Sequence, residues 1–201
     1  MAQNRSIFEE VSGEKAETVK PAGGMIDATD PDGRGFMRVW LLVLFALVFL
    51  MIAVGGLTRL TDSGLSITEW APIKGAIPPM SVEAWEAEFQ KYQQIPEFQI
   101  QNSTMTLEEF KGIYWWEWGH RQLGRFVGLV WAVGFFGMLA LRRMPRGWTN
   151  RALLLGGLGG LQGAIGWWMV SSGLTGRMVD VASYQLTIHL KLTFAILNLI
   201  L

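Results

Sequence analysis

The chain has 201 residues, of which 50% are hydrophobic and 17% charged, and it contains 24 glycines and 10 tryptophans. This composition is typical of an integral membrane protein. The formal net charge is zero, so no excess of positive charge favours a nucleic-acid partner. The absence of cysteine excludes disulfides, thiolate-ligated iron–sulfur clusters and a cysteine-ligated haem.

Residues 1–36 are polar and mix both charges with Gly, Pro and Ala, which predicts a flexible cytoplasmic arm. This stretch is too long for the start of a cleaved signal peptide, and its glutamates argue against a mitochondrial transit peptide. We therefore expect a multi-pass protein of the bacterial inner membrane, with the mitochondrial inner membrane as the alternative. The membrane domain is expected to occupy residues 37–201.

Four apolar segments follow, each close to the roughly 20 residues that a helix needs to cross a bilayer. They are Val39–Leu57, Phe126–Leu141, Ala152–Val170 and Val181–Leu201. The expected fold is an all-α membrane protein with four transmembrane helices. The last segment ends at Leu201 without a cap or a flanking charge, which is typical of a fragment truncated at its C-terminus.

The charges of the connecting loops predict the orientation. The link between the second and third segments, residues 142–151, carries four arginines and no acid, so it is expected in the cytoplasm. The N-terminus then lies in the cytoplasm, and the second and fourth segments run from outside to inside. The long outer loop, about residues 58–112, has a helix start at Ser81 and a capping box at Thr106–Glu109.

The chain has two histidines, His120 and His189, near the starts of the second and fourth segments. Ionisable residues within a membrane are costly and face a protein interior, so each is a functional candidate. Two imidazoles on neighbouring parallel helices can clamp an iron porphyrin from its two faces. The alternative is that both are satisfied buried groups, with Glu117 pairing with His120 and Gln185 with His189.

Helical spacing places further side chains around His120. Glu117 lies one turn before it and Gly124 one turn after it, where a flat macrocycle needs space. Arg121 and Arg125 lie one turn apart on an adjacent face and suit carboxylates such as haem propionates. Glu117 is either a proton acceptor or relay in a low-dielectric site, or a group that orients the imidazole of His120.

Several motifs resemble those of a known family. The chain resembles haem A synthase of the branch shared by alphaproteobacteria and mitochondria, over about residues 37–201. The motifs that carry the resemblance are Gly55–Ser66 (GGLTRLTDSGLS), Trp70–Ile73 (WAPI), Gly75–Pro79 (GAIPP), Glu117–Arg121 (EWGHR) and Gln162–Leu174 (QGAIGWWMVSSGL).

The resemblance implies an eight-helix bundle made of two four-helix halves, of which this chain matches the first. It assigns His120 and His189 to the iron of the substrate, haem O, and Glu117 to the acidic residue one turn before the first ligand. Haem b is expected in the second half, whose ligands have no counterpart in these residues. The implied reaction oxidises a methyl group of haem O to a formyl group, which gives haem A for cytochrome oxidase.

The resemblance also implies partners. These are haem O itself, membrane lipid, the C-terminal half, haem O synthase and cytochrome oxidase assembly factors. Two alternatives stay open: a bis-histidine haem b subunit that exchanges electrons with quinol, and a structural subunit with buried histidines. The pigment that the protein binds distinguishes among the three.

Overall fold

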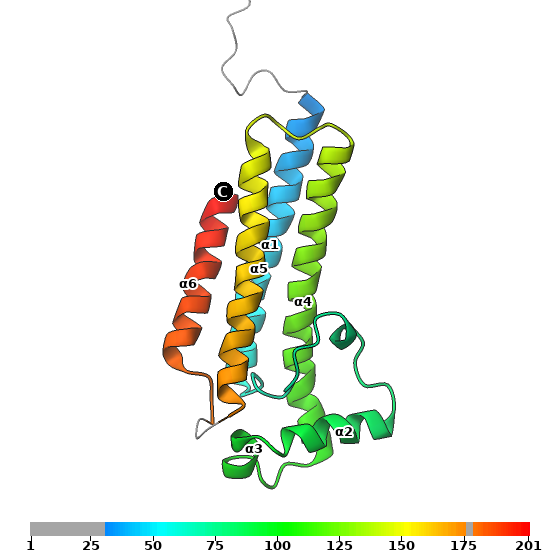
Figure 1. Cartoon of the computed structure of the whole chain (residues 1–201), viewed down its shortest axis with the longest axis vertical. Helices are drawn as coiled ribbons and strands as arrows, with labels where there is room; N and C mark the ends of the chain where they lie inside the picture. The colour runs from blue at the N-terminus through cyan, green and yellow to red at the C-terminus, as the bar shows by residue number, and fades with distance from the viewer. Residues whose placement is uncertain (1–30, 176–178) are drawn as a thin grey trace, which may run out of the picture.

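The computed structural model describes residues 31–175 and 179–201, and these ranges contain helices and loops but no strand. Figure 1 shows the long helices side by side, with shorter helices gathered at one end. The elements in chain order are α1 (Pro31–Leu60), η1 (Lys74–Ala76), α2 (Val82–Tyr92), α3 (Pro96–Ile100), α4 (Leu107–Ala140), α5 (Trp148–Gly173) and α6 (Ser183–Ile200).

Three of these helices, α1, α4 and α5, are long and apolar enough to cross a membrane. The expected all-helical membrane fold is therefore confirmed. The fourth expected crossing corresponds to α6, which has 18 residues and includes His189 and Lys191 among its apolar side chains. By length and composition α6 is not among the candidate spans of the described chain, so its crossing stays a prediction.

The predicted helix starts agree well with the structure where capping residues mark them. Thr106 accepts a hydrogen bond from the backbone N–H of Glu109, whose carboxylate accepts one from the Thr106 N–H, so the capping box is present. Ser81 caps α2 through the Ala84 N–H. By contrast, α1 begins at Pro31, so residues 31–36 of the expected arm are helical. The rest of that arm lies outside the described residues.

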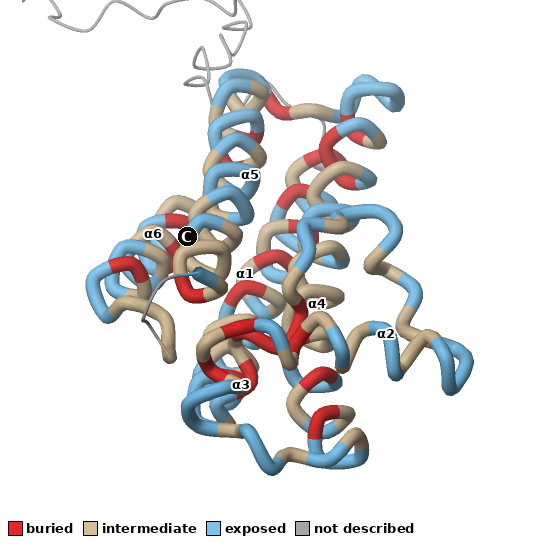
Figure 2. Tube along the Cα trace, turned by 60° about the horizontal axis from the view of Figure 1, so that its bottom comes forward, coloured by how far each residue is buried: buried red, intermediate tan, exposed pale blue. Residues whose placement is uncertain are grey.

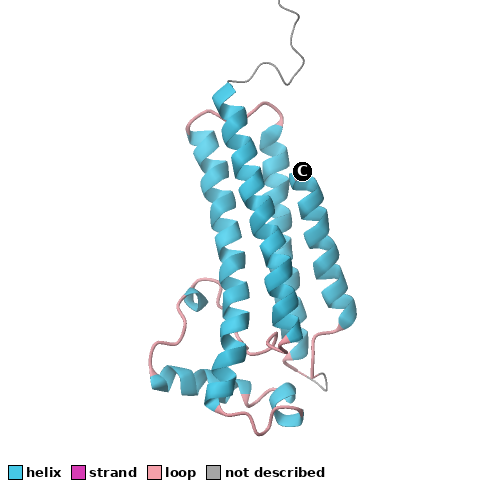
Figure 3. Ribbon diagram, turned by 180° about the vertical axis from the view of Figure 1, so that it is seen from behind, coloured by secondary structure: helices cyan, strands magenta, loops and turns pink. Residues whose placement is uncertain are grey.

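The four long helices form a ring in which each packs against two others. α1 and α5 each contact both α4 and α6, so α4 and α6 lie diagonally opposite each other. Both run in the same direction, from the end that carries α2 and α3 toward the opposite end, as Figures 1 and 3 show. The two histidine-bearing helices are therefore parallel as predicted, but the prediction that they are neighbours is wrong.

Two tryptophans hold α1, α4 and α5 together near the end that carries the arginine link, hereafter the arginine end. The Trp40 indole donates to the Val130 carbonyl at 3.0 Å, and the Trp131 indole donates to the Ala152 carbonyl at 2.9 Å. Their rings occupy the space left by Gly134 and Gly156 on the facing helices, where a Cβ atom would lie 2.0 and 2.1 Å from indole atoms. These contacts join α1 to α4 and α4 to α5.

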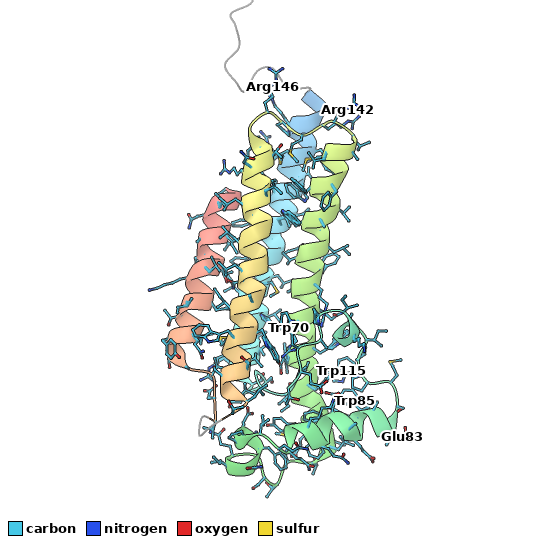
Figure 4. All side chains as sticks on the ribbon, viewed as in Figure 1. Trp70, Glu83, Trp85, Trp115, Arg142 and Arg146 are labelled. Atoms are coloured by element: carbon cyan, nitrogen blue, oxygen red, sulfur yellow. The ribbon has the colours of Figure 1, made fainter. Side chains whose placement is uncertain are left out.

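The opposite end is covered by residues 61–106, hereafter the loop module. Its apolar core packs on the first turns of α4, where Phe110 contacts Phe89 and Tyr92 of α2 and Tyr114 contacts Trp85. Figure 2 shows buried residues concentrated in this part of the chain as well as in the bundle. Figure 4 places Arg142 and Arg146 at one end of the molecule and Trp85 and Glu83 at the other.

Candidate functional site

His120 lies in α4 with its imidazole against α1. A Cβ atom added to Gly55 would lie 3.1 Å from His120 Nε2, so a side chain at this position would press on the ring and move it by a few tenths of an ångström. Among the described residues, His120 has no hydrogen-bond partner. The residue is only partly buried, so the ring is available to bind a group from outside the chain.

His189 has a matching environment on α6. A Cβ atom added to Gly166 of α5 would lie 3.1 Å from His189 Cε1. The Nδ1 atom of His189 is buried and has no hydrogen-bond partner. The helix around it is held by Gln162 of α5, whose side-chain amide donates to the His189 carbonyl at 3.0 Å and to the Thr193 hydroxyl at 2.6 Å.

The two histidines lie at similar depth. Gly55 is five residues before the end of α1, and Gly166 is seven residues before the end of α5. At 1.5 Å per residue, the two imidazoles are about 8 and 11 Å from the helix ends at the loop module. The two imidazoles sit on the diagonal helices α4 and α6. The contacts with Gly55 and Gly166 therefore place both histidines in the half of the bundle nearer the loop module.

Glu117 is buried one turn before His120, but it binds the loop module and not the imidazole. One carboxylate oxygen accepts from the Ser66 hydroxyl at 2.7 Å and the Ile67 N–H at 2.8 Å. The other accepts from Arg121 Nε at 3.0 Å and Nη2 at 2.6 Å. The alternative in which Glu117 satisfies His120 is therefore wrong.

The matching alternative for the second histidine is also wrong. Gln185 is buried on α6, but its side-chain oxygen accepts from the Ser172 hydroxyl at 2.7 Å, and it makes no described bond to His189. Both histidines thus lack the partners that would mark them as purely structural.

Arg121 and Arg125 hold the loop module to α4. Arg121 donates to the carbonyls of Ile67 and Glu69 at 2.8 and 3.1 Å, in addition to its pair with Glu117. Arg125 donates to Pro72 at 2.8 Å and to Ala71 at 3.1 Å. A guanidinium has five N–H donors, so each arginine retains donor capacity, and a contact to haem propionates stays a prediction for both.

Sequence reasoning missed the residues that shape the space around the histidines. Gly124, expected to leave room beside His120, faces the Met51 methyl group on α1, 3.7 Å from where its Cβ would be. The glycines that contact the imidazoles are Gly55 and Gly166, on other helices. Both belong to motifs quoted above, but spacing along one helix does not reveal a contact between helices.

His120 and His189 are the described residues that could hold an iron porphyrin. The described residues contain no group of three or more His, Cys, Asp or Glu side chains that could hold a metal ion. A porphyrin supplies four nitrogens itself and needs two axial ligands, which two unpaired imidazoles on parallel helices can provide.

Comparison with known proteins identifies the family. Residues 38–201 match the family described as "Cytochrome oxidase assembly protein". The chain belongs to this family. It is 68% identical to the Heme A synthase of Dinoroseobacter shibae, over all of this chain and 52% of that protein.

Two further relatives carry the same name. The chain is 63% identical to the Heme A synthase of Paracoccus denitrificans, over 98% of this chain and 51% of the relative. It is 62% identical to the Heme A synthase of a Ruegeria species, over 97% of this chain and 52% of the relative. The chain thus spans about half the length of the curated relatives that it matches, and no solved structure matches it. The expected family is confirmed.

Proposed function

We propose that this chain provides the substrate-binding half of a haem A synthase, an oxidoreductase that converts a methyl group of haem O to a formyl group. The relatives that bear this name are about twice as long as the chain, which supports an eight-helix protein made of two four-helix halves. The observation that carries the proposal is the pair of unpartnered imidazoles, at similar depth on parallel helices.

His120 and His189 would bind the iron of haem O from its two faces, with Arg121 and Arg125 near enough to the module end to pair with propionates. Haem b would belong to the second half. Oxidation of an unactivated methyl group is chemistry that a bound cofactor would supply, and the protein would position the porphyrin and manage protons and electrons. Cytochrome oxidase is the protein that would take up the haem A formed.

Ligation is tested by spectroscopy. His120→Ala and His189→Ala should each abolish the low-spin bis-imidazole spectrum of the haem bound by this half, because one axial ligand is lost. Thr187→Ala is the control, since Thr187 is exposed on α6 two residues before His189. An unchanged spectrum in either histidine variant would make that residue structural. Bound haem b alone, without haem O or haem A, would favour the electron-transfer alternative.

Glu117 is our candidate for proton movement during methyl oxidation. Glu117→Gln keeps the shape and the bonds from Arg121 but removes the titrating group. If Glu117 moves protons, the variant should bind haem O and form little haem A when the extracted haems are separated by chromatography. Normal formation of haem A would leave Glu117 as the residue that positions the loop module on α4.

The orientation follows from the loop charges. We propose that the arginine end faces the cytoplasm of a bacterium and that the loop module faces outward. These 201 residues contain no cysteine, so each single-cysteine variant introduces one thiol at a known position. Glu83→Cys should react with a membrane-impermeant maleimide added to whole cells, and Asn150→Cys should react only after lysis. The reverse pattern would overturn this orientation.

A further inference from the structure

One segment of the loop module exposes a run of large apolar side chains. Ile73, Ile77, Met80 and Val82 are 84%, 72%, 81% and 64% exposed. Isolated exposed apolar residues need no explanation, but a run of this kind marks an interaction surface. We propose that Ile73–Val82 is a re-entrant segment that inserts into the lipid leaflet on the side of the loop module.

The depth of this segment supports lipid as its partner. The Trp118 indole donates to the Gly75 carbonyl at 3.1 Å, and Arg125 donates to the Pro72 carbonyl at 2.8 Å. The segment therefore lies beside residues 118–125 of α4. Figures 1 and 3 show the single turn of η1 displaced from α2 along α4 toward the arginine end.

The level of residues 118–125 can be placed against α1. His120 lies against Gly55, and Gly124 faces Met51, which is nine residues before the end of α1 at Leu60. At 1.5 Å per residue, Met51 is about 14 Å inside that end. Met51 and Gly55 both belong to the uncharged stretch Val39–Leu57, around which the apolar part of the bilayer must lie.

The backbone around η1, at residues 71–75, is satisfied within the described structure, whereas no described donor reaches the carbonyls of residues 76–80. Irregular backbone at membrane depth is tolerated only where its polar groups are satisfied by protein. The carbonyls of residues 71–75 all accept hydrogen bonds within the described structure. Their donors are the Gly75 N–H and Arg125 for Ala71, Arg125 for Pro72, the Ala76 N–H for Ile73, the Ile77 N–H for Lys74, and Trp118 for Gly75.

The prolines and the exposed lysine of the segment are also compatible with its insertion into the leaflet. Two of its positions, Pro78 and Pro79, are prolines and have no N–H to satisfy. Lys74 is exposed, and a lysine at the border of a bilayer can extend its amine to the headgroups while its methylenes remain in the apolar region. The chain returns to water after Val82, where Glu83 stands in the first turn of α2.

Depth measurement by electron paramagnetic resonance tests the proposal. A nitroxide is attached to Ile77→Cys in the protein reconstituted in phosphatidylcholine and phosphatidylglycerol vesicles. Leu129→Cys, on an exposed apolar position of α4, is the lipid control, and Glu83→Cys, six residues from Ile77 and exposed on α2, is the water control. Collision with oxygen reports lipid, and collision with a water-soluble nickel chelate reports water.

The label at position 77 should collide with oxygen more than with the nickel chelate, as at position 129, and the ratio should be inverted at position 83. A ratio at position 77 equal to that at position 83 would overturn the proposal. An immobilised label protected from both reagents would also overturn it, because the segment would then be covered by protein. Adding Ile73→Asp to a Met80→Cys label should raise the nickel collision rate, since a carboxylate resists burial in lipid.

Discussion

The close contact between Trp40 and Gly134 allows a sharp test of how the bundle is held together. In Gly134→Ala, the new Cβ would lie 2.0 Å from Trp40 Nε1 and 2.3 Å from Cδ1. Carbon atoms prefer separations of about 3.5–4.0 Å, so the indole must move by well over an ångström. Its position is fixed by burial, at 5% exposure, and by its bond to the Val130 carbonyl.

The cost has two parts. Forcing a methyl group into a packed contact costs about 1–3 kcal/mol, and loss of the indole hydrogen bond costs about 1 kcal/mol. The control is Gly137→Ala, one turn away on α4, where an added Cβ meets nothing within 4 Å. Both variants gain the same helix propensity of about 1 kcal/mol. Gly134→Ala should therefore be less stable than Gly137→Ala by about 2–4 kcal/mol.

Unfolding by SDS in mixed micelles, followed by far-UV circular dichroism, measures this difference. The comparison between the two alanine variants removes effects of micelle composition and of helix propensity. Equal free energies of unfolding for Gly134→Ala and Gly137→Ala would refute the view that the Trp40 contact with α4 holds this seam of the bundle.

Two further predictions concern the loop module and the site. Burial raises the pKa of Glu97 from 4.5 to about 7, so the folded module holds this proton more tightly than the unfolded chain does. The module should therefore lose about 3 kcal/mol as pH rises from about 4.5 to 7, and hydrogen exchange should show no such loss in Glu97→Gln. Gly55→Ala should alter the haem spectrum by pushing on His120, whereas Gly56→Ala, with open space around it, should not; equal spectra would contradict that contact.

Much of the fold was predictable because local signals determine it. Apolar length located α1, α4 and α5, and the Thr106 capping box fixed where α4 begins, since both are read from adjacent residues. The ring order was not predictable in the same way. Nothing in the segments distinguishes a neighbouring from a diagonal position, and the side chains that decide it, such as Trp40 and Trp131, contact glycines on helices distant in sequence.

The same distinction applies to the candidate site: features read from adjacent residues were predictable, and contacts between distant segments were not. His120 and His189 are visible in the sequence because an ionisable residue in an apolar segment is conspicuous. The partners of Glu117 were not visible, because periodicity along α4 points only to residues of α4 and led to His120. The actual partners outside α4, Ser66 and Ile67, lie about fifty residues earlier in the chain. Tertiary contacts of this kind override the one-turn spacing on which the prediction relied.

The unbroken length of α4 has a mechanical consequence. It runs unbroken from Leu107 to Ala140 and contains no proline, the residue that most often kinks a helix. At 1.5 Å per residue it is a rod about 51 Å long, with the loop module fixed to one end and His120 about 20 Å from that end. A tilt of about 5° around Ala140 would move Leu107 by roughly 4 Å and His120 by roughly 3 Å. A displacement of the loop module would therefore be transmitted along this rod to the imidazole.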